Sequence, residues 1–422
     1  MTYEITSCDA IEILDSRARP TLEVRVGVNG RTSRAGVPSG ASTGTREATE
    51  LRDGDATRFG GAGVARAVAN VTGEIAALLV GRRVGSLAEL DRLVIDADGT
   101  TTKSRLGANA VVGVSMAAAR AMAHADGIEL WRWLAPEAVG PRLPVPHFNV
   151  INGGRHAQNA LAPQEFMVAP LGAPTFAEAL RAGAEVYAAL RGLLHDAGHD
   201  VGLGDEGGFA PNLCTADEAC TLLVAAIDAA GYRAGRDGVA IALDPAASEF
   251  RNADGTYQLI DGEPSLSSNA LIDYWADLAD RFPIWSLEDG LGEDDTNGWK
   301  AITDRLGKRV QLVGDDNFVT NPAIIEAAIA DGIANCALIK VNQIGTVTET
   351  LAAMALCRRA AYGQMVSHRS GETDDPFIAD LAVATGCGQL KSGAPARGER
   401  VAKYNRLLAI ERAEPGLPYG LS

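Results

Sequence analysis

The sequence predicts an α/β protein in which a (β/α)8 barrel follows a small α+β domain. From Val239 onward, short apolar runs alternate with helix-like stretches, and most of these runs end on a chemically reactive side chain. Before Pro136 the pattern differs, because a strand hairpin is followed by helices. Strand-then-helix repetition is typical of a parallel sheet or barrel. We therefore place the N-terminal domain at residues 1–138 and the barrel at 139–422, and the chain is long enough for both.

The first domain begins with a hairpin. Residues 21–28 alternate apolar and polar side chains, as a half-buried strand does, and residues 31–38 return as a second strand. Between them, Asn29-Gly30 is the dipeptide that best tolerates the positive φ angles of a tight turn. The segment PSGASTG at 38–44 is too rich in Gly, Ser and Pro for a regular element, and we expect a mobile loop. Helical patterns then cover 63–80, 86–95 and 109–126.

The barrel region opens with two apolar strand candidates close together, at residues 144–151 and 164–170. After Val239 the alternation of strand and helix becomes regular and continues to a helix that starts near Arg397. In a closed barrel, reactive residues gather at the carboxyl ends of the strands. Residues at these ends should therefore meet in one mouth: Asp244, Glu288, Asp315, Lys340, His368 with Arg369, and Lys391.

Composition excludes some classes of function. The formal net charge of −16 disfavours general binding to nucleic acid or to an anionic membrane, whose phosphates would be repelled. The start of the sequence lacks the basic-then-apolar order of a signal peptide, and we find no apolar stretch long enough to span a bilayer. The six cysteines are scattered and contain no CxxC pair, which favours reduced thiols. We therefore expect a cytoplasmic protein.

Three carboxylates at equivalent strand ends suggest a metal site. Asp244, Glu288 and Asp315 would repel one another in one mouth, and a hard divalent cation relieves that repulsion. Ligands that are all oxygen suit Mg²⁺. The alternative is that these acids cap helices or form surface salt bridges. For one acid alone that alternative is the better explanation, but three at equivalent positions favour the metal.

The two lysines at strand ends can supply complementary chemistry. A lysine beside Mg²⁺ loses affinity for its proton, so Lys340 could remove a proton from the carbon next to a carboxylate. Lys391 could stay charged and hold the substrate carboxylate. The alternative for each is a lysine that extends its ammonium group to solvent from a strand end.

Glycine-rich loops carry further candidates. GDEGGFAP at 204–211 surrounds Glu206 with glycines, and a carboxylic acid in a partly desolvated mouth can keep its proton near neutral pH, which suggests a general acid. Gln164 and Glu165 lie near a strand start. His156 lies in NGGRHA, where a lone histidine is more often a structural hydrogen-bonding group than an acid or base.

The loop SHRSGET at 367–373 suggests a phosphate site. It places Arg369 next to Ser370, and the charge and planar donor fork of arginine suit phosphate. The alternative is that Arg369 pairs with Glu372 or Asp374. None of these motifs settles a function by itself.

Taken together, the segments resemble enolase, the Mg²⁺-dependent glycolytic hydratase, over essentially the whole chain. The matching stretches occur in the family's order: PSGASTG, ELRDGD, KSRLGANA, NGGRHA, QEFM, GDEGGFAPN, ALDPAASEF, SLEDGL, LVGDD, LIKVNQIGT, SHRSGETDD and LKSGAPARGERVAKYN. The resemblance implies an enolase-type barrel whose opening strands pair as a hairpin, usually in a homodimer or a larger homo-oligomer. It implies a phosphorylated carboxylate substrate and the interconversion of 2-phosphoglycerate with phosphoenolpyruvate and water.

The resemblance also implies a role for each candidate residue. Asp244, Glu288 and Asp315 match the ligands of a first Mg²⁺, and Ser42 in the loop at 38–44 matches a ligand of a second, substrate-linked Mg²⁺. Lys340 matches the base that removes the C2 proton. Glu206 matches the acid that helps the C3 hydroxyl leave, with Glu165 beside it. His156 matches a loop residue near the phosphate. Substrate contacts are implied for Gln164, Arg369, Ser370 and Lys391, with His368 among them.

Some positions depart from the family pattern. Ala18-Arg19 stands where the family almost always has Gly-Asn, near the subunit contact. Pro245 and Asn317 follow metal-ligand positions, and Thr296 stands where tryptophan is common. These departures leave two alternatives open. One is an enolase-like paralogue of secondary metabolism, such as a carboxyphosphonoenolpyruvate synthase acting on a phosphonate. The other is a non-catalytic binding or scaffold protein that keeps the fold.

Overall fold

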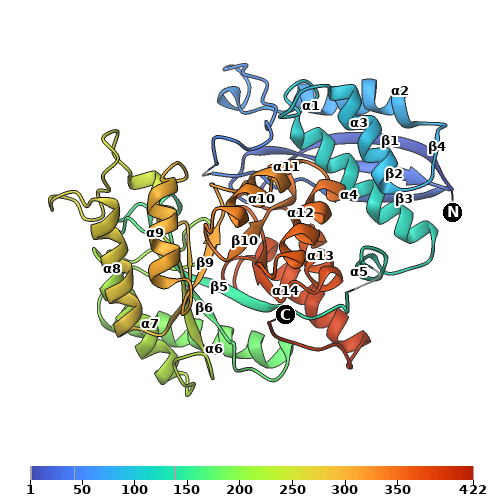
Figure 1. The fold of residues 1–422 in the computed structure, drawn as a ribbon. Coiled ribbons are helices and arrows are strands. Elements are labelled where there is room, and N and C mark those ends of the chain that lie inside the picture. The colour runs from blue at the N-terminus through green and yellow to red at the C-terminus, as the bar shows by residue number, and fades with distance from the viewer. Residues whose placement is uncertain (1, 42, 137–138, 422) are drawn as a thin grey trace.

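The computed structural model describes residues 2–41, 43–136 and 139–421. In the described chain, a four-stranded sheet with its helices precedes a closed eight-stranded barrel, which confirms the predicted fold class (Figure 1). The boundary at residues 138 and 139 stays a prediction, because Glu137 and Ala138 lie outside the described residues.

The N-terminal sheet has the strand order β3-β2-β1-β4. The hairpin is confirmed: Asn29 and Gly30 have φ angles of 49° and 76° between antiparallel β2 and β3. Strand β1 was not predicted, and its pairing with β2 shifts register between Ile5 and Ser7, which interrupts the alternation that reveals a strand. The strands are β1 (Tyr3–Leu14), β2 (Pro20–Val28), β3 (Arg31–Gly36) and β4 (Arg83–Val84).

The helices of this domain pack against one face of the sheet. Helix α4 is buried almost all round, because it contacts β2 and β3 as well as α11 (Val341–Ile344) and α12 (Val347–Arg359) of the barrel region (Figure 1). The predicted helix at 63–80 runs as α1, a wider π turn at Val71–Ile75, and α2. The helices are α1 (Ala65–Asn70), α2 (Ala76–Leu79), α3 (Leu87–Asp98), α4 (Ala108–Ala125) and α5 (Leu130–Trp133).

The Ala18 departure falls in a strained turn between β1 and β2. The backbone of Ala18 has φ 57°, in the left-handed region that favours glycine. Left-handed backbone costs an L-residue about 1–2 kcal/mol, and glycine loses about 0.4–1 kcal/mol through its freer unfolded chain. We expect Ala18→Gly to raise the free energy of unfolding by about 0.5–1 kcal/mol, measured by thermal and urea unfolding.

The exposed Ala69 within helix α1 gives the matched control. Its backbone is helical, so Ala69→Gly should destabilise the protein by about 0.5–1 kcal/mol. A loss of stability in both variants would show that the turn at Ala18 carries no strain.

The barrel strands follow the order β10-β11-β12-β5-β6-β7-β8-β9 around a closed ring. The pair β5 and β6 is antiparallel, as the resemblance implied, and β6 is also antiparallel to β7. The other neighbours around the ring are parallel. The strands are β5 (Val145–Asn152), β6 (Glu165–Ala169), β7 (Ala240–Asp244), β8 (Ile284–Glu288), β9 (Gln311–Gly314), β10 (Cys336–Ile339), β11 (Gly363–Ser367) and β12 (Gln389–Lys391).

Helices cover the outside of the barrel, and two of them, α6 and α7, lie in sequence between β6 and β7. None of the described helices combines the length and apolar character needed to cross a membrane. The helices are α6 (Phe176–Asp196), α7 (Ala216–Ala229), α8 (Ser268–Arg281), α9 (Thr296–Leu306), α10 (Pro322–Ala330), α11 (Val341–Ile344), α12 (Val347–Arg359), α13 (Phe377–Thr385) and α14 (Gly398–Ala413).

Side chains alternate between the two faces of each strand, and this alternation determines which of them point into the barrel toward the mouth. Ala240 and Ala242 lie on the same face of β7 as Asp244, and both are fully buried. On β10, Cys336 and Leu338 share a face with Lys340 in the same way. Small and apolar side chains thus fill the barrel below the reactive residue that ends each strand.

Candidate active site

The lysine and carboxylates at the barrel mouth form one charge cluster. Lys391 Nζ lies 2.8 Å from Asp244 Oδ2, 2.9 Å from Glu288 Oε1 and 3.2 Å from Glu165 Oε1. Burial disfavours the ammonium form, but the carboxylates outweigh burial and hold the pKa of Lys391 well above its usual value. Lys391 is therefore a fixed positive charge, as the sequence predicted.

Lys340 lies on the neighbouring side of the mouth. Its Nζ is 2.5 Å from Asp315 Oδ2, and Gln343 Nε2 donates to Asp315 Oδ1 at 2.8 Å. Burial lowers the pKa of Lys340, but the neighbouring carboxylates Asp315 and Glu288 together outweigh burial, so the protein's own groups raise the pKa. The predicted lowering of this pKa depended on a neighbouring cation, and the protein's groups alone act in the opposite direction.

The described residues contain two groups that bring three metal-ligand atoms within 4.8 Å of one another. One is Asp289, Asp315 and Asp316, and the other is His156, Glu165 and Glu206. The predicted set of Asp244, Glu288 and Asp315 is not gathered as closely, and Lys391 bridges two of its members.

The hydrogen bonds of Asp289 argue against it as a metal ligand. Both of its oxygens already accept hydrogen bonds from backbone N–H groups, from Asp315 N at 2.9 Å and from Asp316 N at 3.0 Å. The oxygens of Asp315 and Asp244 Oδ2 are instead held by side chains, which can move away from a cation. In contrast, Glu288 Oε2 is buried without a hydrogen-bond partner among the described residues. An oxygen-only donor set with such an orphaned carboxylate oxygen fits Mg²⁺.

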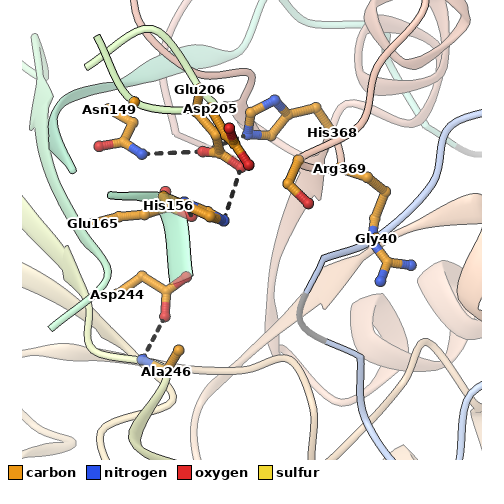
Figure 2. Close-up of polar contacts among 12 residues, drawn as sticks. Gly40, Asn149, His156, Glu165, Asp205, Glu206, Asp244, Ala246, His368 and Arg369 are labelled. Atoms are coloured by element: carbon orange, nitrogen blue, oxygen red, sulfur yellow. Dashed lines mark hydrogen bonds and ion pairs between the residues drawn. The ribbon is translucent and has the colours of Figure 1, made fainter. Parts of the chain in front are cut away.

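Glu206 is surrounded by one amide and two imidazoles (Figure 2). Asn149 Nδ2 donates to Glu206 Oε2 at 3.0 Å. His156 Nε2 lies 3.7 Å from Glu206 Oε1, and His368 Nε2 lies 3.2 Å from Oε2. Glu165 completes the group, with its Oε1 lying 3.8 Å from His156 Nδ1. His156 therefore lies between the two carboxyl groups, with one ring nitrogen toward each.

The environments of Glu165 and Glu206 shift their pKa values in opposite directions. Burial, reinforced by Glu206, raises the pKa of Glu165 well above its usual value. Burial raises the pKa of Glu206, but His368, His156 and the charged Arg400 together outweigh burial and hold the pKa of Glu206 well below its usual value. The protein's own groups therefore favour the ionised form of Glu206 and the protonated form of Glu165, and the role of Glu206 as the acid stays a prediction.

Arg369 is held by a residue that sequence reasoning missed. Its Nη1 and Nη2 lie 3.0 and 3.1 Å from the two oxygens of Glu47, which follows the loop at 38–44 (Figure 2 shows Arg369 reaching toward Gly40). Of the two alternative partners, Glu372 accepts from the Arg369 backbone N–H, and Asp374 Oδ2 lies 3.6 Å from Arg34 Nη2. The buried pair of Arg369 and Glu47 joins the N-terminal domain to the barrel mouth.

The structure brings most of the predicted residues to the lining of one narrow cavity. Glu288 lies beside this cavity through its contact with Lys391, and Ser42 lies outside the described residues. Besides Glu47, sequence reasoning missed Asn149 and Arg400, whose sequence contexts gave no signal for contact with Glu206 and His368. The predicted residues that line the cavity are His156, Gln164, Glu165, Glu206, Asp244, Asp315, Lys340, His368, Arg369, Ser370 and Lys391.

The departures from the family pattern leave these groups in place. Pro245 has no N–H, and Asp244 Oδ1 instead accepts from Ala246 N at 3.0 Å. Thr296 begins α9, whose first turn is capped by the Asp295 side chain. The buried amide of Asn317 has no hydrogen-bond partner among the described residues, and nothing in the structure explains the choice of asparagine there.

Comparisons with known proteins show the family to which the chain belongs. The model of the enolase N-terminal domain matches residues 5–134, and the model of the enolase C-terminal TIM barrel domain matches residues 141–415. An enolase of Rubrobacter xylanophilus (strain DSM 9941 / JCM 11954 / NBRC 16129 / PRD-1) is 56% identical over 414 residues, which cover 97% of this chain and 95% of that protein. With both domains matched in order around the mouth described above, this chain belongs to the enolase family.

Proposed function

We propose that this protein is a hydro-lyase that interconverts 2-phosphoglycerate with phosphoenolpyruvate and water. The observation that carries the proposal is that Lys340 and the carboxyl pair of Glu165 and Glu206 line one buried mouth. Full-length similarity to an enolase supports the same reaction. Removal of a proton from C2 and of hydroxide from C3 requires a base and an acid in one site.

We propose that Asp244, Glu288 and Asp315 hold Mg²⁺ in this mouth, with Lys391 beside them. When bound, Mg²⁺ supplies positive charge that offsets the second negative charge that develops on the substrate carboxylate. The site of a second, substrate-linked Mg²⁺ at Ser42 remains a proposal from the family resemblance. Lys391 contributes fixed positive charge through its raised pKa, and Gln164 lies at the start of β6 on the same cavity.

Different residues of the chain remove the C2 proton, protonate the C3 hydroxyl and bind the phosphate. Lys340 takes the C2 proton, and its ion pair with Asp315 orients Nζ into the mouth. The Glu165–Glu206 pair supplies the proton with which the C3 hydroxyl leaves as water, and His156 lies between the two carboxyl groups. Arg369 and Ser370 bind the phosphate, for which the Glu47 ion pair sets the direction of the guanidinium group.

We further propose that the protein acts in the cytoplasm as a homodimer. Its membership of the enolase family supports this setting. Light scattering coupled to size-exclusion chromatography measures the mass against 44.0 kDa per chain. A single-chain mass at working concentration would contradict the dimer.

The test of the reaction is an assay with purified protein and Mg²⁺. Addition of 2-phosphoglycerate should generate the ultraviolet absorbance of phosphoenolpyruvate. A phosphonate analogue tested side by side addresses the paralogue: turnover of the analogue alone would replace the proposed substrate. A folded, Mg²⁺-loaded protein that turns over neither compound would leave only the scaffold alternative.

A further inference from the structure

Arg400 is a fully buried arginine on α14. It contacts the backbone of two loops, the one that carries Glu206 and the one that carries Arg369. Its Nη1 donates to Arg369 O at 2.6 Å, and its Nη2 lies 2.5 Å from Ser370 O and 3.2 Å from Asp205 O. Its relative exposure is 0%. Asp205 directly precedes Glu206, so one guanidinium group ties the Glu206 loop to the loop that carries Arg369.

The same guanidinium group determines where the hydrogen of His368 lies. Arg400 Nη1 is 2.6 Å from His368 Nδ1. Arginine has only donors and keeps its charge in proteins, so Nδ1 must accept and carries no hydrogen. The single ring hydrogen of a neutral His368 then lies on Nε2, the nitrogen that is 3.2 Å from Glu206 Oε2.

Three charged groups act on the buried ring of His368. Glu206, from the loop at 204–211, and Glu372, from the loop that follows β11, favour a charged imidazole, whereas Arg400 on α14 disfavours it. Burial acts in the same direction as Arg400, and the pKa of His368 is lowered to about 4. The hydrogen-bond geometry and the surrounding charges therefore agree on an uncharged ring.

We propose that Arg400 is a positioning residue that keeps His368 neutral, with its hydrogen on Nε2 as a donor toward Glu206. His368 then holds the carboxylate of Glu206 and does not itself deliver a proton to the substrate. The consequence for turnover rests on the proposed function, whereas the protonation state of His368 does not.

Nitrogen-15 NMR of histidine-labelled protein tests the protonation state directly. The chain has six histidines, and His368→Gln identifies the signals of His368. From pH 5.5 to 8.5 we expect one bare and one hydrogen-bearing ring nitrogen, with no imidazolium form. In Arg400→Met the titration of His368 should move upward by at least about two pH units. The variant loses the donor to Nδ1 and a positive charge near the ring, while the carboxylate of Glu206 remains.

Arg406→Met is the matched control, because Arg406 lies on the same helix and pairs with Asp380 away from His368. It should leave both the His368 signals and the turnover of the wild type unchanged. An imidazolium form of wild-type His368 near neutral pH would overturn the proposal, as would an Arg400→Met spectrum identical to that of the wild type.

The kcat of His368 variants provides a second test, which does not require the Arg400→Met variant to fold. Glutamine can accept from Arg400 through its amide oxygen and donate toward Glu206 through its amide nitrogen, so it imitates the neutral ring. We expect His368→Gln to keep kcat within about 10-fold of wild type, and His368→Leu to lose at least about 100-fold. Equal losses in the two variants would contradict the neutral donor. A wild-type protein without turnover would refute the proposed function, while the NMR result would still decide the inference.

Discussion

Replacing Lys340 by methionine is expected to lower kcat by about 10³- to 10⁴-fold, the upper part of the range for a general base. The methionine side chain fills a similar volume but cannot take the C2 proton. The phosphoenolpyruvate absorbance assay measures kcat. Lys308→Met, which removes an exposed lysine on the barrel surface, should leave kcat unchanged.

A second substitution distinguishes the role of Lys340 as a base from its role as a positive charge. Lys340→Arg keeps a cation beside Asp315 but cannot give up its proton, so a base requirement predicts a loss as large as that in Lys340→Met. Substantial turnover by Lys340→Arg would mean that Lys340 acts only as a positive charge.

Isotope exchange locates the affected step. In deuterium oxide, the wild type should exchange the C2 hydrogen of 2-phosphoglycerate, and Lys340→Met should not. Glu206→Gln should slow formation of phosphoenolpyruvate while C2 exchange persists, because its defect lies at the C3 hydroxyl. Exchange at the wild-type rate in Lys340→Met would assign the base to another residue.

The residues that the sequence located best are those at the ends of regular strands. Asp244, Lys340 and Lys391 could be found because apolar runs fix where a strand stops, and barrel geometry fixes where its end points. Glu47 and Arg400 could not be found in this way. Their partners, Arg369 and His368, lie far away in the sequence, and nothing local in either segment indicates the pairing.

The pKa of Glu206 shows a second limit of sequence reasoning. Glycine-rich flanks and a barrel mouth predicted burial correctly, and burial by itself does raise the pKa of a carboxyl group. The sign of the net shift depends on His156 and His368, whose approach to Glu206 is a matter of tertiary structure. Local patterns thus located the acid, whereas its protonation required the positions of its neighbours.

Removal of Mg²⁺ by a chelator is expected to abolish turnover, and Glu288→Gln should weaken Mg²⁺ binding by at least about 100-fold, more than the 10- to 100-fold typical of an outer-shell partner. The amide keeps the shape of Glu288 but loses the charge that a hard cation requires. Isothermal titration of Mg²⁺ measures the affinity, and Mg²⁺ added in excess should restore turnover of the chelated wild type. Glu326→Gln, an exposed change on α10, is the control that should bind Mg²⁺ as the wild type does.

Asp316→Asn tests which of two carboxylate sets binds Mg²⁺: Asp244, Glu288 and Asp315, or Asp289, Asp315 and Asp316. Asp289 already uses both oxygens on backbone N–H groups, whereas Glu288 Oε2 is buried with no hydrogen-bond partner among the described residues. We therefore expect Asp316→Asn to change Mg²⁺ affinity much less than Glu288→Gln. The opposite order would move the metal to the Asp316 side of the mouth. Lys391 would then serve chiefly to balance Asp244 and Glu288, the two carboxylates that its ammonium group already contacts.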